Sequence, residues 1–171
     1  MLFRLILRSK YITNPETGKV LAVTSCVSNA NVVLKTKDPN GELQKWIRQA
    51  TEDTSKNEFY ILPVGCPKEA LMFHKNHYPC RDTNGNSAMI YGKANDKFRW
   101  WKINDDDQTI EAVVCPGRVV DITGVADGSD IRVVNKEQGR PTYQKWMFVS
   151  VCTLLTVPLT QPIPCIENGF T

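Results

Sequence analysis

Two cysteines and both histidines of the chain lie in one stretch, and these residue types can bind a metal or act as nucleophiles. They follow in the order Cys66, His74, His77 and Cys80, and two thiolates with two imidazoles could hold zinc tetrahedrally. Because the spacing matches no standard zinc finger, the four residues are weak metal candidates, and we expect no metal. A disulfide between Cys66 and Cys80 and a plain loop stay open as alternatives.

The remaining polar residues show no catalytic pattern. An acidic run at 105–107 falls at a predicted turn, and a hard cation would need further oxygen ligands, so we expect a solvated loop. The asparagine- and glycine-containing stretch at 82–86 is a turn rather than a phosphate-binding loop. Since no pair of residues is suited to acid–base catalysis, the sequence favours a binding protein without a cofactor over an enzyme.

The chain has 6 cysteines, an even number that permits disulfides, but spacing alone assigns no pairs. Arg4 and Arg8 bracket only a short apolar run, so residues 1–10 do not resemble a secretory signal peptide. We therefore expect reduced, largely buried thiols at Cys26, Cys115 and Cys152. These features favour a cytoplasmic protein, with secretion not excluded.

The overall composition is that of an ordinary globular domain, with 42% apolar and 23% charged residues. A net charge of +3 with scattered Lys and Arg excludes a nucleic-acid footprint. The uncharged stretch 146–166 contains threonines and prolines that make it a poor membrane span. We predict one domain over residues 1–150 and an extended, Pro-rich tail over residues 151–171.

Three tryptophan-centred segments recur along the chain at intervals of about fifty residues. The first and third share the sequence Gln-Lys-Trp, at 44–46 and 144–146, and the second keeps Trp101 but has Arg99 in place of glutamine. Such recurrence predicts three copies of one structural unit, each ending at its tryptophan segment.

Short β-branched or aromatic runs, bounded by Gly, Pro, Asn and Asp, precede each tryptophan segment, and this pattern is typical of strands and turns. The runs are 2–7, 18–23, 31–34, 58–62, 69–73, 87–91, 109–114, 119–124 and 131–134. No window shows a sustained helical stripe. The sequence predicts an all-β fold with four strands per unit, about twelve in total.

These tryptophan segments and the Val-Asp-Ile run at 120–122 resemble the ricin-B-type β-trefoil lectins, above all the short single-domain lectins of fungi. The resemblance covers residues 2 to 150 and implies a β-trefoil of three pseudo-repeats. Residues two apart on a strand face the same side, so each Gln and Trp should point inward together. Trp100 alternates to the other face and is the candidate for an exposed indole.

In that family a sugar is held by an Asp on the Leu-Asp-Val strand, an aromatic ring and a polar residue beside the Gln. The first unit has Ala22 and Lys35 at the Asp and ring positions, and the second has Met72 and Tyr91. The third keeps the carboxylate, Asp121, with Val134 at the ring position. The resemblance therefore implies a degenerate sugar site in the third unit, with Tyr91 as a second-repeat candidate; its residues are Asp121, Gly124, Asn135, Tyr143 and Gln144.

The resulting hypothesis is a carbohydrate-binding lectin whose partners are glycans or glycoproteins, without a membrane span, and with a homodimer allowed. We expect Asp121 at the surface, accepting hydrogen bonds from Gly124 or nearby backbone N–H groups. The alternative is a β-trefoil protease inhibitor that acts through the loop at 64–86, because a fold does not determine a function. A third hypothesis is an interaction module that has lost sugar binding.

Overall fold

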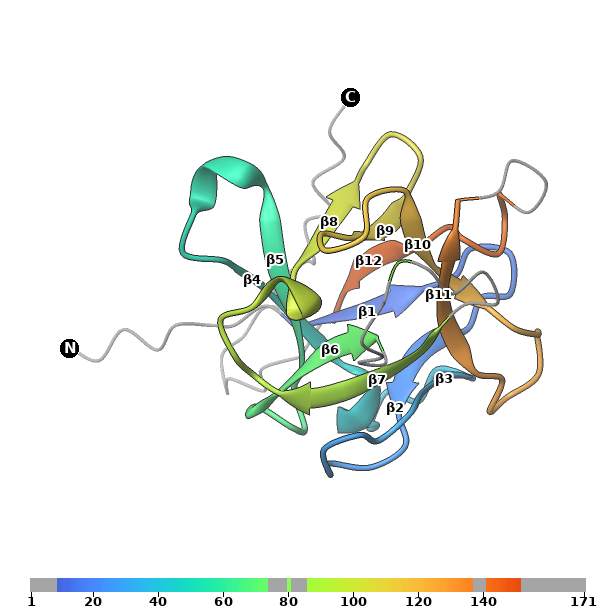
Figure 1. The fold of residues 1–171 in the computed structure, drawn as a ribbon. Helices are drawn as coiled ribbons and strands as arrows, with labels where there is room; N and C mark the ends of the chain where they lie inside the picture. The colour runs from blue at the N-terminus through green and yellow to red at the C-terminus, as the bar shows by residue number, and fades with distance from the viewer. Residues whose placement is uncertain (1–8, 74–79, 81–85, 137–140, 152–171) are drawn as a thin grey trace, which may run out of the picture.

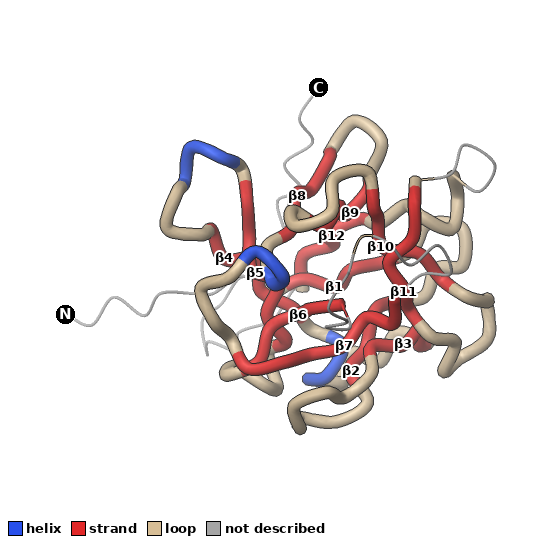
Figure 2. The backbone as a smooth tube through the Cα atoms, viewed as in Figure 1, coloured by secondary structure: helices blue, strands red, loops and turns tan. Residues whose placement is uncertain are grey.

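The computed structural model of the 171-residue chain describes residues 9–73, 80, 86–136 and 141–151. This part of the chain is all-β, with twelve strands and three short 3-10 helices (Figures 1 and 2). The expected number of strands is therefore confirmed. The run at 2–7, which we predicted as a first strand, lies outside the described residues, and the first described strand begins at Lys10.

The strands fall into three consecutive units of four. The first unit contains β1 (Lys10–Thr13), β2 (Val20–Val23), β3 (Val32–Lys35) and β4 (Trp46–Ala50). The second contains β5 (Glu58–Pro63), β6 (Glu69–Phe73), β7 (Asn86–Gly92) and β8 (Trp101–Asn104). The third contains β9 (Thr109–Ala112), β10 (Arg118–Ile122), β11 (Ile131–Asn135) and β12 (Met147–Ser150).

The three repeated tryptophans occupy equivalent, buried positions, as predicted, with exposed fractions of 1%, 0% and 2%. Each indole N–H donates to a backbone carbonyl on the second strand of its own unit. The pairs are Trp46 to Leu21 at 3.0 Å, Trp101 to Leu71 at 2.9 Å and Trp146 to Val120 at 3.0 Å. These bonds satisfy the polar end of each buried ring and fix which residues of the three units correspond.

The side chains two residues before the tryptophans are also buried, although not for the reason that we predicted. Gln44 ends a 3-10 helix, Glu42–Gln44, rather than lying on a strand. Its amide accepts from the Asp38 N–H at 2.7 Å and donates to the Thr36 carbonyl at 2.9 Å. In the second unit, Nε of Arg99 donates to the Gly92 carbonyl at 2.7 Å, and Gly92 is the residue equivalent to Thr36. Arginine thus replaces glutamine as the donor at this position.

The β2–β3, β6–β7 and β10–β11 hairpins meet around the pseudo-threefold axis; in Figure 1 the first two lie in the lower part of the view and the third lies at the right. Bridges join Asn31 to Met89 and Val33 to Asp130, and β11 pairs with β7. The first and last strands, β1 and β12, pair over four residues and bring the two ends of the described chain together. Three four-stranded units closed in this way form a β-trefoil, as the sequence analysis predicts.

Two disulfides link neighbouring units, so the expectation of reduced thiols at Cys26 and Cys115 is wrong. Cys26 bonds to Cys66 and Cys80 bonds to Cys115, with Cα atoms 5.3 and 5.5 Å apart. Each bridge joins the loop after the second strand of one unit to the loop after the first strand of the next. The residues of each pair come together only through the packing of the units, which sequence spacing does not reveal. Cys152 lies outside the described residues.

The junction between the third and first units is closed by charge instead. Lys19 and Asp127 form an ion pair at 2.6 Å, and Asp127 also accepts from the N–H of Thr36 at 3.1 Å and from its hydroxyl at 2.9 Å. These bonds, with that from Lys19 the strongest, lower the pKa of Asp127 to about 2. The residue of the second unit equivalent to Lys19 is Glu69. At the junction between the first and second units, Glu69 accepts a hydrogen bond from the Ser28 hydroxyl at 3.1 Å.

The last described strand, β12, ends at Ser150, and the predicted domain boundary at residue 150 stays a prediction because residues 152–171 lie outside the described structure. The last backbone bond here runs from the Val151 N–H to the Ser9 carbonyl at 3.0 Å. Within the described residues, no helix has the length and apolar character needed to cross a membrane.

Candidate functional site

The candidate carboxylate of the third unit, Asp121, lies on β10 directly opposite Arg132 on β11. Oδ2 of Asp121 accepts from Nη2 of Arg132 at 3.3 Å and from Nε at 3.4 Å. The Asp121 side chain is only 2% exposed, whereas that of Arg132 is 30% exposed. The result is a half-buried ion pair whose guanidinium reaches the surface.

The expectation that Asp121 lies at the surface is therefore wrong. Strand alternation does turn Asp121 away from Val120 and Ile122, but every residue of β10 is buried. The equivalent residues, Ala22 and Met72, are buried as well. Both faces of these second strands are covered in the trefoil, so alternation alone does not predict exposure.

The charged pair distinguishes the third unit from the other two. At the equivalent cross-strand positions, the first unit pairs Ala22 with Val33 and the second pairs Met72 with Met89. Among the three units as the structure describes them, a salt bridge at this position occurs in the third. Sequence reasoning missed Arg132, although a lone charged residue between Ile131 and Val133 in an apolar strand was a usable signal.

The turn residue Gly124 lies just beyond β10, in the loop that joins it to β11. The Asp130 carbonyl closes this loop by accepting from the Thr123 N–H at 3.0 Å and from its hydroxyl at 2.9 Å. A Cβ on Gly124 would lie 3.1 Å from Oγ of Ser129, so a larger residue here would require that hydroxyl to move by a few tenths of an ångström. The loop backbone is thus well defined beside the Asp121–Arg132 pair.

The other third-unit candidates do not lie together with Asp121 on an open surface. Gln144 is buried, and Tyr143 is half-buried against the main core. Tyr143 occupies the position of Leu43 and Phe98 in the other units, which pack against the same core. Asn135 is exposed at the end of β11. This placement favours a packing role for Tyr143 and Gln144.

Tyr91, the second-unit candidate, is 38% exposed at the end of β7. The guanidinium of Arg99 lies 5.3 Å from the centroid of its ring, so one face of the ring contacts a cation. Trp100, the indole that we expected to be exposed, is half-buried and meets the ring of Tyr60 edge-on, with centroids 6.5 Å apart. The open aromatic surface here is therefore Tyr91 rather than Trp100.

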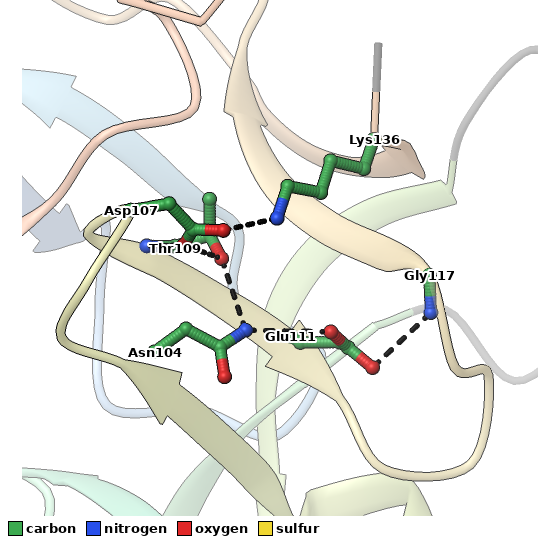
Figure 3. A network of polar contacts seen from close by, with 6 residues as sticks. All are labelled: Asn104, Asp107, Thr109, Glu111, Gly117 and Lys136. Atoms are coloured by element: carbon green, nitrogen blue, oxygen red, sulfur yellow. Dashed lines mark hydrogen bonds and ion pairs between the residues drawn. The ribbon is translucent and has the colours of Figure 1, made fainter. Parts of the chain in front are cut away.

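A polar network ties the β8–β9 turn to the end of β11, next to Asn135 (Figure 3). Asp107 accepts from the Thr109 N–H at 3.1 Å and its hydroxyl at 2.7 Å, and pairs with Lys136. Burial raises the pKa of Asp107, but the bonds from Lys136 and Thr109 outweigh it and hold the pKa below the ordinary value. This residue of the acidic run is thus used to order a turn.

Asn104 and Glu111 extend this network along the β8–β9 hairpin. The Asn104 amide donates to the Thr109 hydroxyl at 3.2 Å and to Glu111 at 3.4 Å. Glu111 in turn accepts from the Gly117 N–H at 3.1 Å. Since every bond runs between neighbouring strands or turns, the network stabilises the frame beside the candidate site.

The zinc interpretation of the Cys–His stretch is wrong for its two cysteines, because Cys66 and Cys80 are both in disulfides and offer no thiolate. Their disulfide partners are Cys26 and Cys115, so a Cys66–Cys80 bond is wrong as well. His74 and His77 lie outside the described residues, as do residues 74–79 and 81–85 of the loop that the protease-inhibitor hypothesis invokes. Elsewhere in the described chain, no cluster of three potential metal ligands occurs.

Comparison with known proteins supports the fold through structure rather than through sequence. No family model matches the chain, and no curated protein matches it significantly. Among solved structures, the designed three-fold symmetric protein ThreeFoil matches with a TM-score of 0.70 at 19% identity, covering 82% of this chain and 97% of ThreeFoil. The chain is thus similar to a protein built from three symmetric units.

The matches also include a lectin and part of an enzyme. The ricin B-like lectin of Macrolepiota procera, solved in complex with lactose, matches with a TM-score of 0.63 at 13% identity, over 84% of this chain and 95% of the lectin. The exo-β-1,3-galactanase 1,3Gal43A of Clostridium thermocellum matches with a TM-score of 0.71 at 23% identity, over 84% of this chain. Because the match spans only 30% of the galactanase chain, the fold recurs there as part of a larger protein.

Proposed function

We propose that this β-trefoil is a carbohydrate-binding protein, not an enzyme, and that its third unit binds the sugar through Asp121 and Arg132. The observation that carries the proposal is the half-buried ion pair at a position where the other two units have apolar pairs. The same backbone is built without charges twice in this molecule, so folding does not require the pair. A role in binding gives a reason for it.

The pair offers both kinds of hydrogen-bonding group that adjacent sugar hydroxyls need. A carboxylate accepts from hydroxyl donors, and a guanidinium donates through a planar fork. Bonds to ionised groups are about twice as strong as neutral ones. Because Arg132 is partly exposed and Asp121 is buried behind it, the sugar would contact the guanidinium, and the Asp121 carboxylate would hold that guanidinium in place.

The fold shared with a lectin that binds lactose supports this proposal, and lactose is therefore the first probe. The site lacks an aromatic ring at Val134, which is buried, so affinity should be low for each site. The partners would be glycans or glycoproteins. A homodimer would raise the avidity of such a weak site without any new contact.

The decisive experiment converts the third unit to the pair found in the first, with Asp121→Ala and Arg132→Val together. We expect at least a tenfold loss of affinity for lactose, or for the best ligand from a glycan array, measured by calorimetric titration, because charged hydrogen bonds contribute about 1.5–3 kcal/mol each. Asp130→Asn, which alters an exposed carboxylate in the same hairpin, is the matched control.

Unchanged affinity in the folded double variant would overturn the proposed site. A glycan array with no ligand would overturn the proposed function itself. The double variant suits this purpose better than Asp121→Ala alone, because the single change leaves the Arg132 guanidinium without its carboxylate and mixes a loss of stability with a loss of binding.

A further inference from the structure

A shallow depression of about 310 Å³ lies on the second unit, between the β4–β5 hairpin and the segment that follows β7. Its volume is at the lower end of the range for small-molecule sites, about 300–1,000 Å³. The lining side chains are mostly polar: Gln49, Ala50, Thr51, Glu52, Tyr60, Lys93, Ala94 and Asn95. None of them belongs to the Asp121–Arg132 pair.

The amide groups of this depression have their acceptor atoms already occupied from within the protein. Gln49 lies opposite Tyr60 across the β4–β5 ladder, and its Oε1 accepts from Nζ of Lys93 at 3.0 Å. The hydroxyl of Tyr60 donates to Oδ1 of Asn95 at 3.3 Å. A lysine can only donate, so its bond fixes the orientation of the Gln49 amide.

The groups left for a ligand are therefore donors. Each amide retains an NH₂ group, and the ammonium of Lys93 retains N–H groups beyond the one that bonds Gln49. Lys93 also lies 4.9 Å from the centroid of the Tyr60 ring, a second contact that holds the ammonium over the depression. Two amide NH₂ groups and one ammonium therefore line the same depression, and such donors are suited to an oxyanion.

We propose that this depression is a second ligand site, for a carboxylate or sulfate group carried by a molecule of about the size of one sugar ring. The bonds to the oxyanion come from Lys93, Gln49 and Asn95. Glu52, also in the lining, carries a negative charge that would repel an oxyanion and limit its affinity. Because Glu52 is exposed, solvent screens this repulsion. Its carboxylate could also accept hydrogen bonds from hydroxyl groups of the ligand. The site is independent of the proposed lactose site.

Two isosteric substitutions remove the amide NH₂ donors and keep the amide oxygens that bond within the protein. Asn95→Asp keeps an oxygen to accept from Tyr60, and Gln49→Glu keeps one to accept from Lys93, while each replaces the ligand-facing NH₂ by an oxygen. The matched control is Lys97→Gln, an exposed lysine outside the depression. Thermal melting should show that all three variants fold as the parent does.

The measurement is a titration of the ¹⁵N-labelled full chain with methyl glucuronide, with sodium sulfate and with neutral methyl glucoside, at constant ionic strength. The reporters are the backbone amides of Lys93 and Asn95 and the indole N–H of Trp100, which packs against Tyr60. We expect shifts with glucuronide or sulfate but not with glucoside, and at least about a tenfold weaker response in Asn95→Asp and Gln49→Glu.

A response to glucuronide alone would identify a carboxylate ligand, and a response to sulfate as well would identify any tetrahedral or planar oxyanion. Equal shifts with glucoside, no shifts at all, or the same weakening in Lys97→Gln would overturn the proposal. Repeating the titration with the Asp121→Ala, Arg132→Val double variant separates the two sites, because the oxyanion response should persist there even if lactose binding is lost.

Discussion

The first and third units have almost the same backbone in their β2–β3 and β10–β11 hairpins. In both, a threonine closes the loop through its N–H and hydroxyl, Thr24 onto the Asn31 carbonyl and Thr123 onto the Asp130 carbonyl. Both loops also include a residue with positive φ, Asn29 at 71° and Gly128 at 86°. The cross-strand pair beside these loops is apolar in the first unit and charged in the third.

This comparison separates what the trefoil needs from what it merely permits. Tryptophan burial, loop closure and the hairpin contacts around the axis recur in both units, so they belong to the frame. The charged pair occurs in one of them, so the frame does not depend on it. The junctions differ in the same way, since two are closed by disulfides and one by the Lys19–Asp127 ion pair.

The largest expected effect on stability comes from the buried tryptophans, and it tests whether the first and third units contribute equally to the stability of the fold. Trp46→Ala and Trp146→Ala should each lower the free energy of unfolding by about 3–5 kcal/mol, because each removes a fully buried indole and its bond to a strand carbonyl. Urea denaturation measures both. Trp100→Ala, at a half-buried position, should cost less, and a much smaller loss for Trp146 than for Trp46 would break the equivalence.

Removing the disulfides at the two junctions should have the next largest effect on stability. Replacing Cys26 and Cys66 together by alanine, or Cys80 and Cys115, should cost about 4 kcal/mol in the chain-entropy model for loops of 40 and 35 residues. Thermal melting with and without reductant measures this effect. Rapid labelling of these four thiols in the folded, non-reduced protein would contradict the pairing.

The expected cytoplasmic location stays a prediction. The two disulfides favour the opposite location, because disulfides persist chiefly in oxidising compartments.

The cross-strand pair should have a smaller effect on stability. Asp121→Ala alone should cost about 1–3 kcal/mol, because it leaves the Arg132 guanidinium beside a strand without its carboxylate. Adding Arg132→Val should recover most of that loss, since an ion pair can often be replaced by apolar residues at little cost. A double variant that is less stable than Asp121→Ala would show that the third unit needs its charges to fold.

The smallest effect concerns the junction closed by charge, and it depends on pH. The pKa of Asp127 falls from 3.8 to about 2 in the folded protein, so its contribution to stability is present above pH 3.8 and is lost as the pH falls through about 2. The difference in melting temperature between the parent and Asp127→Asn should therefore shrink over that interval. Glu16→Gln, which removes an exposed carboxylate from the loop of Lys19, is the control.

The sequence by itself determined the three-unit plan. Strands β2, β3, β5 to β7 and β9 to β11 lie within about two residues of their predicted ranges, because β-branched runs and the turn residues that bound them are local signals. The burial of Trp46, Trp101 and Trp146 follows from their recurrence in register. Correspondence of Ala22, Met72 and Asp121 was also available from the sequence, and the indole bonds to the preceding residues confirm it.

The tertiary structure alone decided which cysteines form disulfides and which residue pairs with Asp121. Cys26 and Cys66 are 40 residues apart and meet because one unit packs its loop against the next, which no local spacing encodes. Asp121 is buried because the outer face of β10 is covered in the trefoil, and its partner Arg132 comes from the register of β10 with β11. Alternation and turn chemistry act within a few residues, whereas burial and pairing depend on surfaces that exist only after the three units close around their axis.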